Sequence, residues 1–310
     1  MQKQIYYQYE NKLHKQIIKL CHSLELPLHY NKKGPKLFTN YQRVGLIILF
    51  LRSKKSLIEF IKELFESRWP IWLSLKEIPG KSTLHDWMKL FNLNFLRKLI
   101  EQTVSQEKPS VMAIDATGID SWQRSRHYER RRKQCGFSEE HMPYAKADVL
   151  VDTKKKLVYD FTFRIKPRHD VLGAKTIFKR LKVKNVLILG DKGYDAEELH
   201  QIAFEKCNKF YAPIRKSSRN RPNGRFRKKA FDNPPINKGM RSISETVIRS
   251  LKVRITSLRS KLHYMKKREF AWHIIAYNLK LILQLISELL MMKQPSCYSG
   301  CSLFMTILIY

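Results

Sequence analysis

Acidic residues are scarce in this chain of 310 residues. Asp and Glu together number 27 against 60 Lys and Arg, which leaves a formal net charge of +33 at pH 7. Such an excess goes far beyond what solubility requires of a folded protein, and it indicates a polyanionic partner, with nucleic acid as the first expectation. An enzyme that acts on small metabolites has no need of so strong a field. We therefore expect no small-molecule substrate.

Cysteine pairs and long apolar runs are also missing. The five cysteines are odd in number and scattered without a C-x-x-C pair, so the sequence predicts neither a disulfide framework nor a structural zinc site. The longest uninterrupted apolar run covers residues 44–51, whereas a membrane span needs roughly 18 residues. The N-terminus has no apolar signal core. These absences predict an intracellular chain without a membrane segment.

The first 105 residues have the pattern of a basic segment followed by helices. Residues 1–36 form a basic leader, and apolar residues in 37–105 follow helical spacing. A short helix, a turn with Gly80 and another helix fit a helix-turn-helix-like DNA-binding module, and a plain helical bundle fits this segment equally well. The residues that can cap or start these helices are Thr39 or Asn40, Ser56 and Ser82.

From Pro109 the pattern changes to short buried strands. Three strands come first, and two later ones alternate with helices. This order predicts an α/β fold in which a mixed sheet has helices on both faces. The expected strands cover 111–114, 148–151, 157–165, 186–189 and 209–213.

The other segments of this half are predicted helices and one loop. Asp170 can cap a helix, and a second helix covers 196–206. Residues 214–240 have the composition of an unstructured basic loop. Two closing helices are expected at about 242–266 and 270–291, and a tail of unknown role follows at 292–310.

Two acidic residues stand directly after apolar strands. Asp115 follows Val-Met-Ala-Ile, and Asp191 follows Val-Leu-Ile-Leu-Gly. An ionised carboxylate beside buried strand residues is costly unless it is paired or binds a metal. Asp191 could instead cap a turn or a helix, but Asp195 and Glu198 already have the D-x-x-E pattern of a helix start. The pattern therefore favours a functional role for Asp191.

Glu245 is a third candidate with two interpretations of equal weight. With Ser242 it has the S-x-x-E form of a capping box, which would give it a structural role only. On a helical projection, however, Glu245 shares one side with Arg249 and Lys252, which suits a metal–phosphate site. The apolar residues that gather on another side of this helix are Val247, Leu251, Ile255, Leu258 and Leu262.

Three acids without a Cys or His ligand set favour a hard cation such as Mg²⁺ or Mn²⁺. Two such ions can activate an attacking oxygen and stabilise a leaving oxygen in phosphoryl substitution. Given the basic charge, a nucleic-acid phosphodiester is the natural electrophile. The sequence contains no G-x-S-x-G, Walker loop or G-x-G-x-x-G motif that would indicate another chemistry.

Several motifs, taken in order, resemble the DDE transposases of bacterial and archaeal insertion sequences, which have a ribonuclease-H-like catalytic core. The resemblance covers residues 37–290, and the family has a Tyr where this chain has Lys238. The motifs that carry it are Asp115-Ala116-Thr117-Gly118, the Ser125–Tyr128–Arg130 stretch, Asp191-Lys192-Gly193-Tyr194-Asp195, the R-x3-E-x6-K spacing of Arg241, Glu245 and Lys252, and Ala276-Tyr277-Asn278-Leu279.

The resemblance implies a ribonuclease-H-like catalytic domain over 106–291 with an all-helical DNA-binding region before it. It implies that Asp115, Asp191 and Glu245 are the catalytic residues and bind two Mg²⁺ or Mn²⁺ ions, with Asp115 shared between them. The loop over 215–229 would hold the DNA backbone. The side chains expected to contact DNA are Arg241, Arg249, Lys252, Lys192, Arg124, Arg126, Arg130, Arg131 and Arg132.

The function implied is cleavage of double-stranded DNA at insertion-sequence ends and transfer of the 3′-hydroxyl into target DNA. The partners would be the terminal inverted repeats and the target, bound by a homodimer or larger synaptic complex in the prokaryotic cytoplasm, at the nucleoid. Two alternatives stay open. The first is a non-catalytic DNA-binding protein, either a decayed transposase or a regulator, and the second is a plain nuclease of the same fold.

Overall fold

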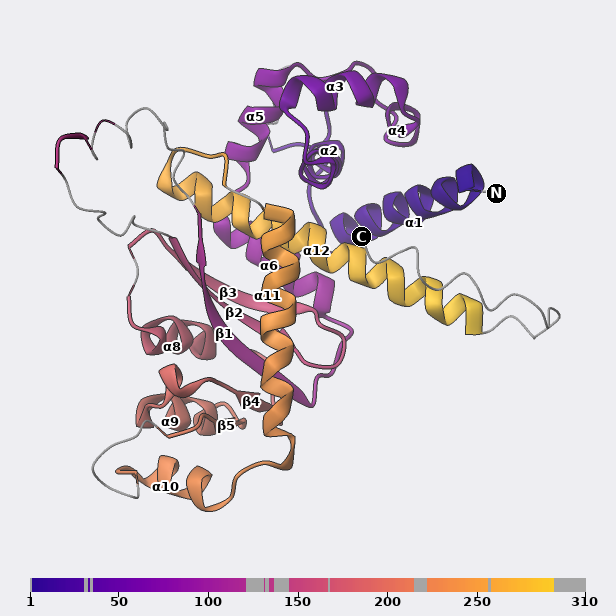
Figure 1. The fold of residues 1–310 in the computed structure, drawn as a ribbon. Coiled ribbons are helices and arrows are strands. Elements are labelled where there is room, and N and C mark those ends of the chain that lie inside the picture. The colour runs from indigo at the N-terminus through magenta and orange to yellow at the C-terminus, as the bar shows by residue number, and fades with distance from the viewer. Residues whose placement is uncertain are drawn as a thin grey trace.

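The structure is a computed structural model (Figure 1). It describes residues 2–30, 33, 36–120, 131, 134–136, 145–166, 168–214, 222–255 and 258–292. Four of the expected DNA contacts, the first part of the predicted basic loop and nearly all of the C-terminal tail lie outside the described residues. These are Arg124, Arg126, Arg130, Arg132, residues 215–221 and residues 293–310.

A mixed five-stranded sheet forms the centre of the molecule, as the sequence predicts. The strand order is β3-β2-β1-β4-β5. The pairs β1–β2 and β2–β3 are antiparallel, and the pairs β1–β4 and β4–β5 are parallel. The strands are β1 (Val111–Ile119), β2 (Ala145–Asp152), β3 (Val158–Arg164), β4 (Leu187–Leu189) and β5 (Lys209–Tyr211).

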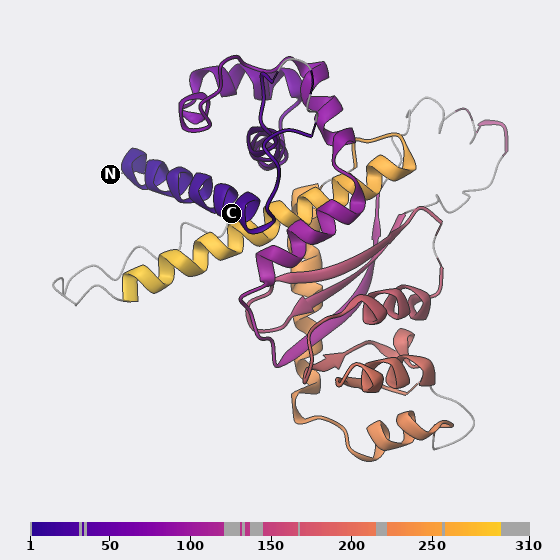
Figure 2. The same ribbon diagram turned by 180° about the vertical axis from the view of Figure 1, so that it is seen from behind.

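Helices cover both faces of this sheet (Figures 1 and 2). Because strand side chains alternate between faces, Val111 and Ala113 belong to one apolar core, and Met112 and Ile114 belong to the other. The helices on the first face are α6 (Leu93–Val104), α11 (Ser242–Ile255) and α12 (His263–Met292), and those on the second are α8 (Asp170–Arg180) and α9 (Glu197–Glu205).

The helices before the sheet begin where local capping allows. Thr39 and Ser56 each form a complete capping box, with Gln42 and Glu59, which confirms both predicted starts. The third predicted start is one residue late, because the helix begins at Lys81 with Gly80 as its cap and no side-chain hydrogen bond. These helices are α2 (Asn40–Ser53), α3 (Leu57–Glu66), α4 (Trp69–Trp72) and α5 (Lys81–Leu90).

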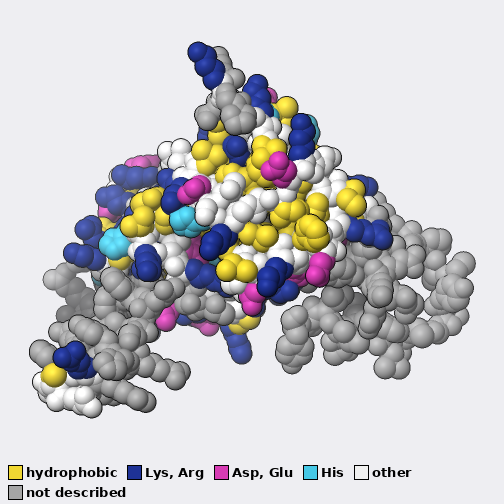
Figure 3. Space-filling model, turned by 90° about the horizontal axis from the view of Figure 1, so that it is seen from above, with side chains coloured by type: hydrophobic (Ala, Val, Ile, Leu, Met, Phe, Trp, Pro, Cys, Tyr) yellow, Lys and Arg dark blue, Asp and Glu magenta, His cyan; other side chains and the backbone are white. Residues whose placement is uncertain are grey.

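The basic leader contains a helix that the sequence analysis did not predict. The helix α1 (Gln2–Ser23) buries Leu13, Ile17 and Leu20 against α2 and α12. Their i, i+4, i+7 spacing is the signal that could have revealed it. One continuous cluster of buried residues joins these N-terminal helices to the first face of the sheet. On the outer side, seen from above in Figure 3, basic side chains are interspersed with apolar ones, and the apolar Phe65 and Ile71 are exposed.

Three local predictions in the second half were wrong. The segment 214–240 is not unstructured, because it contains α10 (Arg225–Asp232) and most of the 3-10 turn η2 (Ile236–Arg241). The helix that begins at Ser242 ends at Ile255, well before residue 266. The cap of α8 is His169, not Asp170. The helix α10 has no buried residue of its own and packs against α9, so its apolar pattern could not predict it.

The helix α12 passes through the middle of the protein. By length and composition, its segment His263–Ser287 is long and apolar enough to cross a membrane, but 56% of its most apolar window is buried inside the protein. Phe270, Trp272 and Ile274 on it are fully buried. Burial of this kind is what the core helix of a folded domain shows.

Candidate functional site

Asp115 lies within β1, and Asp191 lies two residues beyond the end of β4, the parallel neighbour of β1. Ala113 of β1 pairs with Leu189 of β4, and continuing this register by two residues places Asp115 beside Asp191. The backbone of Asp191 remains extended after the strand ends. Because side chains alternate along a strand, Asp115 shares the face of Ala113, which is the face that α11 covers.

Glu245 reaches the same region from the first turn of α11. This helix packs on β1 and β2 through buried Val247 and Leu251, while Glu245 is exposed. Neither hydrogen bond of a capping box forms with Ser242, whose hydroxyl instead donates to the carbonyl oxygen of residue 239 at 3.1 Å. The capping-box interpretation of Glu245 was therefore wrong.

The carboxylate of Glu245 is paired with Arg241. The Arg241 Nη2 atom lies 3.0 Å from Glu245 Oε1, one helical turn away. Arg241 ends η2, and η2 packs against both β1 and β4. The two strands, the 3-10 turn and the helix thus bring one cation and three acids to the region where β1 and β4 lie side by side.

The electrostatics of Asp115 support this convergence. Burial raises the pKa of Asp115, and the carboxylates of Glu245 and Asp191 raise it further. The N–H of Ala116, which donates to Asp115 Oδ1 at 2.8 Å, and the guanidinium of Arg241 lower it. Asp115 therefore lies within electrostatic reach of both other acids and of Arg241.

The donor set fits a hard divalent cation, although the side chains do not form a closed ligand set. Within the described part of the chain, no three His, Cys, Asp or Glu side chains are close enough to bind one ion together. Three like charges repel one another, and the ion pair holds Glu245 toward Arg241. Carboxylate oxygens are nevertheless the ligands that Mg²⁺ and Mn²⁺ prefer.

A buried polar network lies beneath Asp191. The Tyr194 hydroxyl donates to Asp148 Oδ1 at 3.1 Å, and the Thr162 hydroxyl donates to Asp148 Oδ2 at 2.6 Å. A Cβ atom on Gly193 would lie 2.5 Å from Asp170 Oδ2, so a side chain at this position would force the Asp170 carboxylate to move. The D-x-G-Y-D spacing therefore has a physical basis. Asp148 was not predicted as a supporting residue, although its position as an acid in an apolar strand could have indicated this role.

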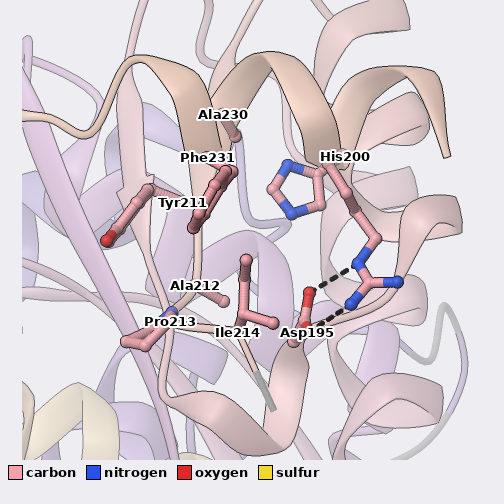
Figure 4. Close-up of a pocket in the computed structure, with 9 residues that line it drawn as sticks. Asp195, His200, Tyr211, Ala212, Pro213, Ile214, Ala230 and Phe231 are labelled. Carbon is pink, nitrogen blue, oxygen red and sulfur yellow. Dashed lines mark hydrogen bonds and ion pairs between the residues drawn. The ribbon is translucent and has the colours of Figure 1, made fainter. Parts of the chain in front are cut away.

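Asp195 has a different role from the one predicted. It does not cap α9, whose cap is Ala196 without a side-chain hydrogen bond. Its buried carboxylate accepts two hydrogen bonds from Arg227, from Nε at 2.7 Å and from Nη2 at 2.5 Å (Figure 4). Glu197 accepts the backbone N–H groups of Phe226 and Arg227, both at 2.9 Å. Asp195 and Glu197 thus anchor α10.

The pocket beside the Asp195–Arg227 ion pair lacks the chemistry of an active site. It is a cavity of about 130 Å³ between α10 and the edge strand β5 (Figure 4). Apolar side chains such as Ile214 and Phe231 make up much of its lining. Burial lowers the pKa of His200, which also lines it, to about 4, so this imidazole is uncharged near neutral pH.

We expect Arg227→Gln to destabilise the protein by about 3 kcal/mol, because it removes the two-bond ion pair that compensates for burial of the Asp195 carboxylate. The matched control is Arg225→Gln, which removes an exposed cation from the same helix and should change stability by less than about 0.5 kcal/mol. Urea denaturation of both variants measures the difference. Equal effects would contradict the assignment of Asp195 as the anchor of α10.

The predicted DNA-binding cations that the structure describes are accessible. Arg249 and Lys252 are exposed on α11, Lys192 is exposed immediately after Asp191, and Arg131 is exposed. Arg241 is partly exposed, with its guanidinium on Glu245.

The chain matches one family of known proteins. A family model described as "Transposase DDE domain" matches residues 106–279, which is more than half of the chain. Among solved structures, the chain is similar to one titled "Cryo-EM structure of piggyBac transposase synaptic complex with hairpin DNA", with 12% sequence identity, a TM-score of 0.42, and coverage of 88% of this chain and 72% of that chain. No curated protein sequence matches this chain.

Proposed function

Because the chain belongs to the family of transposase DDE domains, we propose that it cleaves the ends of an insertion sequence and transfers the 3′-hydroxyl to target DNA. Transposition, DNA recombination and DNA binding are the functions of this family. The observation that carries the proposal is the convergence of Asp115, Asp191 and Glu245 from two strands and one helix, seen in the pKa of Asp115.

In this proposal the three carboxylates hold two divalent ions, Mg²⁺ or Mn²⁺, with Asp115 shared between them. When bound, such ions activate the attacking oxygen and stabilise the leaving oxygen of a phosphodiester. The residues of the chain position the reactants. Asp115 and Asp191 are held by the paired strands, and the network of Tyr194 and Asp148 keeps the backbone at Asp191 in place.

Arg241 has two successive roles in this proposal. Without DNA it pairs with Glu245 and offsets the repulsion among the acids. With DNA bound, the same guanidinium is within reach of a phosphate near the scissile bond, where it can form charge-assisted hydrogen bonds. Arg249, Lys252 and Lys192, which are exposed near these acids, bind the neighbouring phosphates.

The partners and the assembly follow from the same function. We propose that the DNA is the terminal inverted repeats of an element together with its target, that the region 37–105 contributes to DNA binding, and that a homodimer or larger synaptic complex holds the two ends. The site of action would be the nucleoid of a prokaryotic cell. Support comes from the net charge of +33 and from the exposed cations near the acids.

We expect DNA binding to weaken about a thousandfold or more between 50 and 200 mM salt if roughly 6–10 phosphates are neutralised. Each phosphate contact releases condensed counterions, so the logarithm of affinity falls linearly with the logarithm of salt concentration. Fluorescence anisotropy with a labelled duplex measures this slope. A nearly flat response would remove nucleic acid as the partner.

The experiment that tests the proposed function uses the full chain, Mg²⁺ and duplexes that carry the inverted repeats flanking its gene. A transposase cleaves these ends and joins the 3′-hydroxyl to a second DNA molecule. Nicks without joined products would indicate a plain nuclease. Specific binding with no Mg²⁺-dependent cleavage would indicate a non-catalytic DNA-binding protein, and addition of EDTA should abolish any true cleavage.

A further inference from the structure

Four cations gather where the end of α2 and the end of α11 meet the middle of α12. Arg52 and Lys54 are at the C-terminal end of α2, Arg254 is in the last turn of α11, and Lys280 is on α12. The Lys54 ammonium donates to the carbonyl oxygen of Val253 at 3.1 Å. Figure 1 shows the end of α11 meeting α12 beneath α2. We call Arg52, Lys54, Arg254 and Lys280 the cation cluster.

The charges in the cation cluster repel one another. Burial lowers the pKa of Lys280, and Arg254, Lys54 and Arg52 lower it further. Burial also lowers the pKa of Arg254, and Arg52 adds to that effect. The geometry agrees with this, because Lys54 contacts the residue before Arg254 and the Arg254 guanidinium lies 5.9 Å from the centre of the Tyr277 ring, one helical turn before Lys280.

One acid partly offsets this charge. Glu10 is buried, forms an ion pair with Arg52, and accepts a hydrogen bond from the indole N–H of Trp69 at 2.8 Å. Among the residues that the structure describes, Lys54, Arg254 and Lys280 have no ion pair. The cation cluster therefore keeps a net positive charge in a partly buried place, where an anion is held more strongly than on open surface.

We propose that the cation cluster is a binding site for a phosphate of the DNA backbone, distinct from the scissile phosphate. Nine residues separate Glu245 from Arg254, which is about 13 Å along the helix axis. On the helix they project from opposite flanks. The bound phosphate is therefore several nucleotides away from the reacting one. This inference rests on the proposed function only in taking DNA as the partner.

The location favours DNA over a free anion. Exposed Arg249 and Lys252 lie on the flank of α11 that carries Glu245, and Arg254 projects from the other flank, so DNA that contacts both flanks passes around the end of the helix, where exposed Lys54 lies. The cluster also joins the N-terminal helices to the sheet domain. A phosphate bound there touches both regions at once and would fix their common orientation on DNA.

The test compares Lys280→Met, which keeps the length of the apolar stem, with Lys179→Met on the exposed side of α8. Without DNA, Lys280→Met should raise the melting temperature by about 2 °C, because it relieves repulsion. In EDTA at 100 mM salt it should weaken duplex binding about tenfold and lower the logarithmic salt slope by about 1. Lys179→Met should change binding by less than about twofold in the same assay.

Lys54→Gln provides a second test, because Lys54 is exposed and its replacement is not expected to prevent folding. It should give the same drop in salt slope. A structural role for these cations would produce the opposite pattern, with a lower melting temperature and unchanged affinity. Unchanged duplex affinity in both variants would overturn the proposal.

A third measurement separates DNA phosphate from free phosphate. Neutral methylphosphonate linkages are placed one at a time along the duplex. One position should weaken wild-type binding and have no further effect on Lys280→Met. If no position behaves in this way, while inorganic phosphate stabilises the wild type and not Lys280→Met, the site binds a free anion and the proposal is wrong. Because these assays measure binding without divalent ions, their outcome is independent of whether the chain cleaves DNA.

Discussion

Replacement of Asp191 by Asn is expected to lower DNA strand cleavage by several orders of magnitude while DNA binding persists. The substitution keeps the shape of the side chain but removes the charge that holds a divalent ion. Without that ion the attacking oxygen is not activated and the leaving oxygen is not stabilised. DNA affinity should stay the same or increase, because one negative charge near the phosphates is lost. Cleavage of element-end DNA with Mg²⁺ or Mn²⁺, together with a binding titration, measures both quantities.

The same pattern is expected for Asp115→Asn and Glu245→Gln. Melting curves should show that all three variants fold. Asp115→Asn should be at least as stable as the wild type, because burial raises the pKa of Asp115 and its charged form is therefore disfavoured in the folded state. This destabilisation is absent at a pH below the pKa of Asp115 in the unfolded chain. It develops as the pH rises from that value through the higher pKa of Asp115 in the folded protein. Glu245→Gln gives up one exposed ion pair, which contributes about 0–1 kcal/mol.

The matched control for these variants is Glu205→Gln, which removes an exposed carboxylate at the end of α9. Its cleavage rate should equal that of the wild type. If Asp191→Asn also cleaves DNA at the wild-type rate, the assignment of the metal site is wrong. If Glu245→Gln instead unfolds the protein, the role of Glu245 is structural.

Replacement of Asn278 by Leu is expected to destabilise the protein by about 4 kcal/mol, a large part of the stability of a typical domain. The Asn278 side chain is fully buried on α12. Its Oδ1 accepts the N–H of Val158 at 3.0 Å, and its Nδ2 donates to the Val158 carbonyl oxygen and to the Thr103 hydroxyl, both at 2.8 Å. Leucine is similar in size, but it leaves the two backbone groups of Val158 buried without these partners.

Thr103 should contribute little to this loss, because its hydroxyl also donates to the carbonyl oxygen of Ile100 at 2.6 Å. The control on the same helix is Ser287→Ala, which removes only a hydrogen bond to the carbonyl oxygen one turn earlier. It should change stability by less than about 0.5 kcal/mol. Denaturant titration measures both variants. An Asn278→Leu variant as stable as the control would show that Asn278 does not tie α12 to β3 as the distances imply.

Features that depend on residues close together in the sequence were predicted correctly from it. The caps at Thr39 and Ser56 were correct because a capping box needs only four residues. The five strands and the mixed sheet were correct because apolar runs bounded by turns determine strand formation locally. The membership in a transposase family followed from motifs in a fixed order. The roles of Asp115, Asp191 and Glu245 remain predictions.

The features that the sequence did not predict depend on contacts between segments far apart in the sequence. Asp195 and Glu198 have the spacing of a helix start, but Arg227, 32 residues later, binds Asp195 instead. Ser242 and Glu245 have the spacing of a capping box, but the Glu245 carboxylate forms an ion pair with Arg241 instead. The helix α10 exists because α9 packs against it, and the cation cluster exists because the ends of α2 and α11 both meet the middle of α12. A sequence pattern shows which local bonds are possible, and the tertiary structure decides which partner is close enough to compete for the same group.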